Sequence, residues 1–501
     1  MRIYSASAIM KNRKFELYLL FLSTLSTPVF ADNGNDSTLC QDSRYAKEEK
    51  PHLVTSILEN VGINATIYSA DRWLLGREYS ISSFSEIKEN FRKGLKYDGD
   101  QFHINFFAHP YHGALYYTAA RSNNLSFLAS SACTLAGSLI WEECAETDDP
   151  SINDIFSTTF GGIAFGEVMT RLSRLPLNDK TRGRKRFFRE MLSTAISPMS
   201  GLNRVLYGKA WTVKDEHYLY HNREETPYDI RFTLGYSHFN GGKEDKSCTN
   251  VPYLGIDIEY GDVTEGGNRA YDNFTLNAVF TPVGNRPIIN RFDINGSLIG
   301  WQIAEKEHTK ASVSFRQDFT YYDYEKTSFI TDGRESLLRM CETAALGVGV
   351  AQQSEGRVSF LQQLQCHAVM MGGYTSDYYS RDYNIGSGFN VKYLSKTSLG
   401  DRASLGLNLA YHYLFVWKDY ETEQLEKNPE LTTFNTNISR RGGDNGHAAF
   451  FIIQPKLDIR CSQSLYLTTS LDIFTRHSHY RYHENVNSRY FDFKVGLSYQ
   501  L

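Results

Sequence analysis

The feature that most restricts the fold is an alternation of apolar and polar residues that begins near Tyr228 and recurs to the C-terminus. In the clearest case, at the C-terminus, polar or small residues alternate with Phe491, Phe493, Val495, Leu497, Tyr499 and Leu501. A period of two places one residue type on each face of a β-strand. Strands of about 10 residues with one apolar face are typical of transmembrane β-barrels, whereas strands of soluble sandwiches average about 5–6 residues. The pattern therefore predicts an outer-membrane β-barrel over residues 226–501.

The number of strands follows from the same alternation. We predict an antiparallel barrel of about twelve strands, within a range of 10–14, at residues 227–239, 251–262, 272–282, 289–303, 308–323, 338–351, 356–372, 383–396, 402–418, 446–460, 463–476 and 488–501. Short connections alternate with longer ones, such as 323–337 and 419–445. Periplasmic turns and external loops of outer-membrane barrels alternate in this way.

Composition agrees with a membrane barrel. The chain contains 33 Tyr and 31 Phe, residues that are enriched where an apolar wall meets water. A net charge of −4 provides no basic field for nucleic acid. Outside the N-terminus there is no run of 18 apolar residues, which argues against helical membrane spans.

Residues 1–31 resemble a secretory signal peptide. Lys11, Arg13 and Lys14 precede an apolar core at 17–25, and Val29-Phe30-Ala31 provides a small-x-small cleavage site. We expect residues 32–50 to be disordered, since they are polar. Export and a barrel together predict the outer membrane of a Gram-negative bacterium. The expected partners are outer-membrane lipid, lipopolysaccharide and the barrel-assembly machinery.

Between the signal and the barrel, the spacing of apolar residues changes to a helical period. We predict a helical domain over 51–215, lying in the lumen as a plug or against the periplasmic mouth. Its central helices are predicted at about 110–121, 126–146 and 151–173, and Ser151 and Asp154 form a capping-box pattern. Pro198 and Gly201 are predicted to close this half of the chain.

The same helical stretch resembles an uncharacterised family of bacterial outer-membrane proteins, known as a domain of unknown function. The resemblance rests on Asn105, Tyr117, Ser138 and Glu146 and on the motifs His109-Pro110-Tyr111-x-Gly113, Ala120-Arg121, Trp141-Glu142, Pro150-Ser151-x-Asn153-Asp154, Gly161-Gly162-x-x-x-Gly166-Glu167 and Gly201-x-Asn203-Arg204. It covers roughly residues 60–210. The resemblance implies an outer-membrane location and assigns no activity.

Several ionisable residues of this stretch stand among apolar neighbours. As candidate catalytic residues we single out His109, His112, Glu142, Glu146 and Glu167, and as candidate binding residues Arg121, Asp154, Asn105 and Tyr111. Perturbed charges in apolar surroundings often mark a functional pocket.

Three interpretations of these residues remain open. A metal site is one, but no H-E-x-x-H or doubled Glu-x-x-His motif is present, and we assign no metal or cofactor. A second is a hydrolase acting on envelope lipid, in which a histidine would activate Ser130, Ser131 or Ser138, although no G-x-S-x-G motif exists. The third, which we favour, is a paired and hydrogen-bonded network that holds three helices together. Close helix packing through Gly162-x-x-x-Gly166 agrees with it.

A basic helix is predicted at about 182–195, with Arg182, Arg184, Lys185, Arg186 and Arg189. These side chains would either contact lipid phosphates or form a solvated face, and we favour the solvated face. Taken together, the sequence predicts a structural or transport-related envelope protein, with a membrane-embedded enzyme as the alternative.

Overall fold

The computed structural model describes residues 50–76, 80, 83–93, 95–97, 100–147, 149–213, 226–240, 249–283, 286–324, 338–378, 383–417 and 443–501. The predicted signal peptide and nearly all of the segment predicted to be disordered lie outside these residues. Contacts divide the chain into two compact units. One unit comprises the chain up to Lys96 together with Tyr111–His221, and the other comprises Tyr97–Pro110 and Asn222–Leu501.

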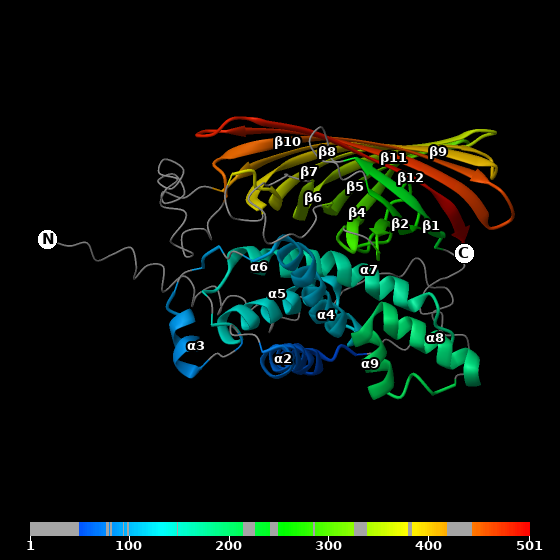
Figure 1. Ribbon diagram of the computed structural model, residues 1–501. Helices are drawn as coiled ribbons and strands as arrows, with labels where there is room; N and C mark the ends of the chain where they lie inside the picture. Colours follow the sequence, from blue (N-terminus) through cyan, green and yellow to red (C-terminus); the bar gives the residue numbers. More distant parts are fainter. Residues whose placement is uncertain are drawn as a thin grey trace. The chain divides into compact units, whose positions relative to one another are not determined.

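The second unit is an antiparallel barrel, whose strands are coloured green to red in Figure 1. Its described residues form twelve strands: β1 (Tyr228–Asn240), β2 (Thr249–Tyr260), β3 (Phe274–Phe280), β4 (Ile289–Lys306), β5 (Thr309–Asp323), β6 (Arg339–Ser354), β7 (Ser359–Thr375), β8 (Tyr383–Leu399), β9 (Ala403–Val416), β10 (Gly446–Arg460), β11 (Leu465–Tyr480) and β12 (Val486–Gln500). Each strand pairs with its neighbours in sequence, and β12 pairs with β1 to close the barrel. The predicted fold class is confirmed.

The two ends of the barrel differ in their connections. Short turns join β4 to β5, β6 to β7, β8 to β9 and β10 to β11, and we call this the turn end. At the opposite end, the loop end, β5 connects to β6 and β9 to β10 through much longer segments.

Side-chain burial along β12 distinguishes the outer face of the barrel wall from its inner face. Phe491, Phe493 and Val495 are exposed on the outside, whereas Asp492 and Lys494 are buried inside. An apolar exterior around a charged interior is the reverse of a soluble barrel and typical of a barrel in lipid. The alternation read from the sequence therefore corresponds to the two faces of the wall.

At the loop end the lumen is filled by an apolar cluster built from strands on different sides of the barrel. Tyr324, which follows β5, stacks on Phe239 of β1 at 4.7 Å and lies 5.7 Å from Phe474 of β11, measured between ring centroids. Tyr374 of β7 meets Phe450 of β10 at 6.0 Å. All five rings are almost fully buried. These contacts place buried aromatic rings from several strands in the lumen near the loop end.

Toward the turn end the lumen is polar and contains a cavity of about 500 Å³. Lys456 of β10 reaches Asp257 of β2 at 2.7 Å, and Arg231 of β1 reaches Asp458 of β10 at 3.1 Å. None of these strands is adjacent to its partner in the sheet. Ion pairs therefore cross the interior of the barrel, where each charge has a neutralising partner.

The first unit is helical, with elements α2 (Leu53–Ser69), η2 (Ala70–Leu74), α3 (Phe84–Asn90), α4 (Tyr111 onward in His109–Ser122), α5 (Phe127–Cys144), α6 (Ile152–Phe156), η5 (Ser157–Gly161), α7 (Gly162–Arg174), α8 (Gly183–Ile196) and α9 (Pro198–Leu206). None of the described helices is both long and apolar enough to cross a membrane. The prediction that Pro198 closes the helical half is wrong, because Pro198 is the first residue of α9. Proline is favourable there because a first-turn residue needs no N–H donor.

The segment Tyr97–Pro110, which includes the π-helix η4 (Ile104–Ala108), groups with the barrel. Phe102 and Phe106 contact Tyr383 of β8, with ring centroids 5.6 and 5.0 Å apart. Tyr383 has the same parity along β8 as the exposed Phe389 and the opposite parity to Lys392, which pairs inside the barrel. This part of the motif stretch therefore packs on the outer face of the wall, not in the lumen as a plug would.

Candidate functional site

Helix α4 is the element around which the motif residues are arranged. Two neighbouring backbones approach it closely: a Cβ on Gly113 would lie 1.8 Å from the carbonyl oxygen of Thr158, and one on Gly162 would lie 2.5 Å from Gly113. A Cβ on Gly166 would collide with Tyr117 at 2.5 Å. The glycines of the motifs therefore permit helix crossings that no larger residue would allow.

One polar cluster lies between α4 and α5. His112 Nε2 and Tyr116 Oη are 2.7 Å apart, and the Tyr116 hydroxyl also donates to the side-chain carbonyl of Asn64 on α2. The ring of His112 meets Trp141 edge-on at 5.0 Å. Burial, together with the charge of Glu142, raises the pKa of Tyr116 well above its usual range. Tyr116 therefore remains a neutral hydrogen-bonding group.

Glu142 in the last turn of α5 and Glu146 just after it, the two glutamates predicted there, each accept a hydrogen bond from a defined donor. Glu142 Oε2 accepts a hydrogen bond from the backbone N–H of Ser151 at 2.8 Å, and Glu146 Oε1 accepts from Trp141 Nε1 at 2.6 Å. Glu142 is almost fully buried. These carboxylates connect α5 to the start of α6 and to its own last turn.

A second cluster lies between α4 and α7 and is centred on Glu167, whose side chain is fully buried. Arg121 donates from Nε to Oε2 at 2.9 Å and from Nη2 to Oε1 at 3.2 Å, Arg171 donates from Nε to Oε1 at 3.0 Å, and Tyr117 donates to Oε2 at 2.7 Å. Burial alone would raise the pKa of Glu167, but the two guanidinium groups outweigh it and lower that pKa to about 2. Glu167 is therefore a permanent anion between two cations.

The remaining predicted residues are dispersed. Asp154 accepts from Asn153, and its backbone N–H donates to Ser151 at 3.3 Å, which is the expected N-terminal cap. Asn105 donates to the Tyr383 hydroxyl within the barrel unit, where His109 is also found. Tyr111 is exposed. The structure thus places His112 in the first cluster, Arg121 and Glu167 in the second, and Asn105 and His109 in the barrel unit.

The hydrogen bonds and ion pairs of these residues join neighbouring helices, and the candidate serines lack the neighbours that a nucleophile needs. Ser130 and Ser138 are buried, and within the described residues neither hydroxyl has a hydrogen-bond partner, while Ser131 donates to the carbonyl of Phe127. A serine nucleophile needs a base within hydrogen-bond reach. Across the described ranges, no three His, Cys, Asp or Glu side chains are grouped closely enough to hold a metal ion.

Five residues of these clusters were not among the candidate residues predicted from the sequence: Asn64, Tyr116, Tyr117, Trp141 and Arg171. Arg171 had a detectable signal, since it stands four residues after Glu167, a spacing that places both side chains on one helix face. Tyr116 and Asn64 are separated by 52 positions, and no local pattern brings them together.

Comparison with known families bears on this same stretch. A family model described as a domain of unknown function, DUF3943, matches residues 94–199. The matched residues include both polar clusters of α4 except Asn64, and they end before Asn203 and Arg204. No curated protein matches the sequence.

Solved structures similar to the chain are barrel proteins. They include the NanC porin (TM-score 0.26, 8% identity, covering 55% of this chain and 100% of that one). OmpT of Vibrio cholerae matches with a TM-score of 0.23 and 7% identity, covering 55% of this chain and 98% of its own. The anion-selective porin of Comamonas acidovorans matches with a TM-score of 0.21 and 8% identity, covering 55% and 100%. The fold assignment rests on the strand pairing described above.

Proposed function

We propose that this chain is an outer-membrane protein whose barrel has a closed lumen and serves as the membrane anchor of the DUF3943 domain in the cell envelope. The observation that carries the proposal is the apolar cluster of the loop end, in which Tyr324 joins Phe239 to Phe474 across the interior. A general diffusion pore needs a continuous water-filled lumen. Buried aromatic rings from opposite sides of the wall exclude water at this level.

The surface of the barrel supports the location. Outward-facing residues of β12 and β9 are apolar and exposed, such as Phe493, Leu497 and Leu405. Exposed apolar side chains on this scale are costly in water and stable in lipid. The N-terminal sequence, which resembles a secretory signal peptide, is consistent with export.

Conductance distinguishes an anchor from a pore. Full-length protein in a planar lipid bilayer is expected to show no steady current. Replacement of both Tyr324 and Phe474 by Ala removes two rings of the cluster and should produce a measurable current, whereas Phe493→Ala on the outer face should not. Steady conductance by the unaltered protein would contradict the proposal.

A second candidate, gated passage of a small polar solute, is favoured by one observation. The cavity of about 500 Å³ at the turn end is lined by both acidic and basic side chains, including Asp257, Arg231 and Lys456. If this candidate is correct, the current of the unaltered protein should appear only when a suitable solute is added.

A further inference from the structure

On three helices of the DUF3943-bearing unit, α2, α8 and α9, polar side chains are buried and apolar side chains are exposed. On α2 the buried residues include Ser56, Asn60 and Asn64, whereas Val54 and Leu58 are exposed. Asn60 and Asn64 donate to backbone carbonyl oxygens of α5 at 2.9 and 3.2 Å. A helix on the surface of a water-soluble domain has the opposite arrangement, with its apolar stripe inward.

Helix α8 repeats the inversion. Arg186 and Ser193 are buried, and Phe187, Phe188, Met191 and Leu192 are exposed, with Phe188 at 58% of its full surface. Residues 188, 191, 192 and 195 share one helix face by their spacing of three and four. On α9, likewise, Asn203 and Arg204 are buried beside the exposed Leu202, Val205 and Leu206.

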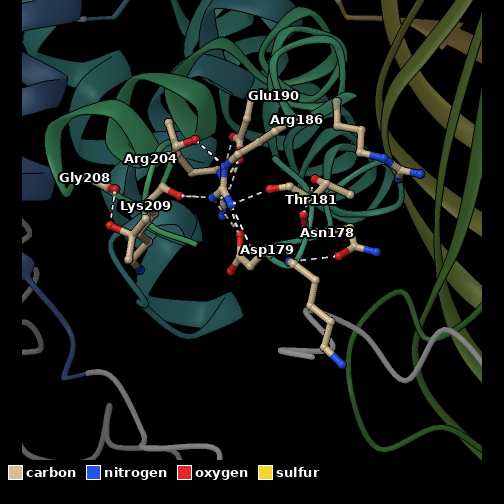
Figure 2. Close-up of polar contacts among 12 residues, drawn as sticks. Asn178, Asp179, Thr181, Arg186, Glu190, Arg204, Gly208 and Lys209 are labelled. Carbon is tan, nitrogen blue, oxygen red and sulfur yellow. Dashed lines mark hydrogen bonds and ion pairs between the residues drawn. The ribbon is translucent and has the colours of Figure 1, made fainter. Parts of the chain in front are cut away.

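Figure 2 shows what fixes this orientation. The side chain of Asp179 accepts from Arg186 at 3.2 Å and from Arg204 at 3.0 Å, and Arg204 also pairs with Glu190 at 2.7 Å. The backbone carbonyl oxygens of Lys209 and Ala210 accept from Arg186 at 2.6 Å each. Because this buried network determines which faces of α8 and α9 point inward, their apolar faces cannot turn inward without leaving charges unpaired.

The chemistry of the surroundings indicates what covers the exposed faces. Arg184 and Lys185, in the first turn of α8, are exposed next to Phe187 and Phe188. A helix that combines basic residues with exposed aromatic and aliphatic residues is typical of one lying in the interface of a bilayer. In addition, Tyr97–Pro110, continuous in the chain with α4, packs on the outer wall of the barrel, which is the apolar wall.

We propose that the outward faces of α2, α8 and α9 are immersed in the acyl region of a lipid bilayer, with Arg184 and Lys185 at the level of the lipid phosphates. The proposal rests on the outer-membrane location proposed above. It makes the DUF3943-bearing unit a membrane-immersed domain that contacts the bilayer without spanning it. The basic helix, for which the sequence favoured a solvated face, is then divided between an internal ion pair at Arg186 and lipid contacts at the exposed positions.

Photolabelling from within the membrane tests the proposal. The full-length protein is reconstituted into phosphatidylcholine vesicles with and without phosphatidylglycerol, together with a phospholipid that carries a diazirine on its acyl chain. After irradiation, labelled peptides are identified by mass spectrometry. Labels are expected on 187–192, on 202–206 and on 54–61, and also on the outer face of β12, which acts as the internal reference for membrane insertion.

Two variants sharpen the result. Phe188→Asp combined with Leu192→Asp changes the charge by −2 on an exposed face and should lower labelling of α8 about tenfold or more, since charges are excluded from hydrocarbon. Lys88→Asp changes the charge of the exposed face of α3 by the same amount and should leave labelling of α8 unchanged.

The outcomes separate the two proposals. Labelled β12 with unlabelled α2, α8 and α9 would overturn the immersion of the helices and leave the barrel location intact. If these faces are unlabelled and the reconstituted protein is a dimer, a second copy of the chain covers them instead of lipid. Absence of label from β12 would contradict the membrane location itself.

Discussion

Lys396 of β8 and Glu259 of β2 meet across the lumen, with Nζ 2.6 Å from Oε1. In a closed ring of twelve strands these two strands stand six positions apart, on opposite sides of the barrel. The contact shows that the polar half of the lumen is crossed by side chains, as the apolar half is by aromatic rings. Ion pairs of the polar half nevertheless differ in burial, and therefore in how much stability their loss should cost.

Lys396→Met is expected to lower the free energy of unfolding by about 1 kcal/mol or less, because a partly exposed ion pair contributes little. The side chains of Lys396 and Glu259 are 29% and 52% exposed to solvent. Lys494→Met is the matched comparison, since its Nζ lies between buried carboxylates at 2.5 Å from Asp472 and 3.0 Å from Asp492. Loss of that lysine should cost about 3–5 kcal/mol. Denaturant unfolding of the barrel measures the change in unfolding free energy for each variant. Equal losses of stability in Lys396→Met and Lys494→Met would contradict the prediction.

Glu167→Gln should destabilise the helical unit by roughly 3 kcal/mol at neutral pH. The pKa of Glu167 lies below its usual value of 4.5, at about 2, so its contribution is complete above pH 4.5 and is lost as the pH falls toward about 2. The variant should therefore lose the pH dependence in that interval. Helical circular dichroism during denaturation provides the measurement.

Glu59→Gln is the control for this experiment. Burial raises the pKa of Glu59, so the charged form is disfavoured and its removal should leave stability at neutral pH unchanged or higher. If both glutamine variants destabilise the unit equally, the arginine pairs do not account for the effect of Glu167.

Gly113→Ala should destabilise the helical unit by about 1–3 kcal/mol or more, because its Cβ would overlap backbone atoms of η5. Gly62→Ala, in the middle of α2, meets nothing within 4 Å and should raise the free energy of unfolding by about 0.5–1 kcal/mol. Thermal unfolding of the two variants should shift in opposite directions. A shift of both in the same direction would argue against the close crossing at Gly113.

Phe106→Ala should release Tyr97–Pro110 from the outer wall while the barrel stays closed. Phe106 is fully buried against Tyr383, and truncation of such a ring costs about 3–5 kcal/mol. Limited proteolysis should then cut within 97–110, with the heat-modifiable mobility of the barrel unchanged. Phe84→Ala removes a ring that is 93% exposed and should leave the cleavage pattern as it is.

The sequence alone determined the barrel, its strand positions to within a few residues and the stretch that carries the family motifs. A period of two is a local property of the sequence. It predicts strands reliably here because each strand has one lipid-facing and one internal face. The cap at Ser151 was predictable for the same reason, since donor and acceptor are three residues apart. Glycines of the motifs could be recognised as close-packing positions without knowing what they approach.

Only the tertiary structure decided which partner each charged residue takes and which way each helix faces. Glu259 and Lys396 are 137 positions apart, and their meeting depends on closure of the whole ring. Arg121 of α4 pairs with Glu167 of α7, which lies 46 positions further along the chain. The inverted faces of α8 and α9 likewise depend on Asp179, which binds two arginines from different helices. Contacts of this kind depend on the path of the chain between the partners, which no spacing in the sequence records.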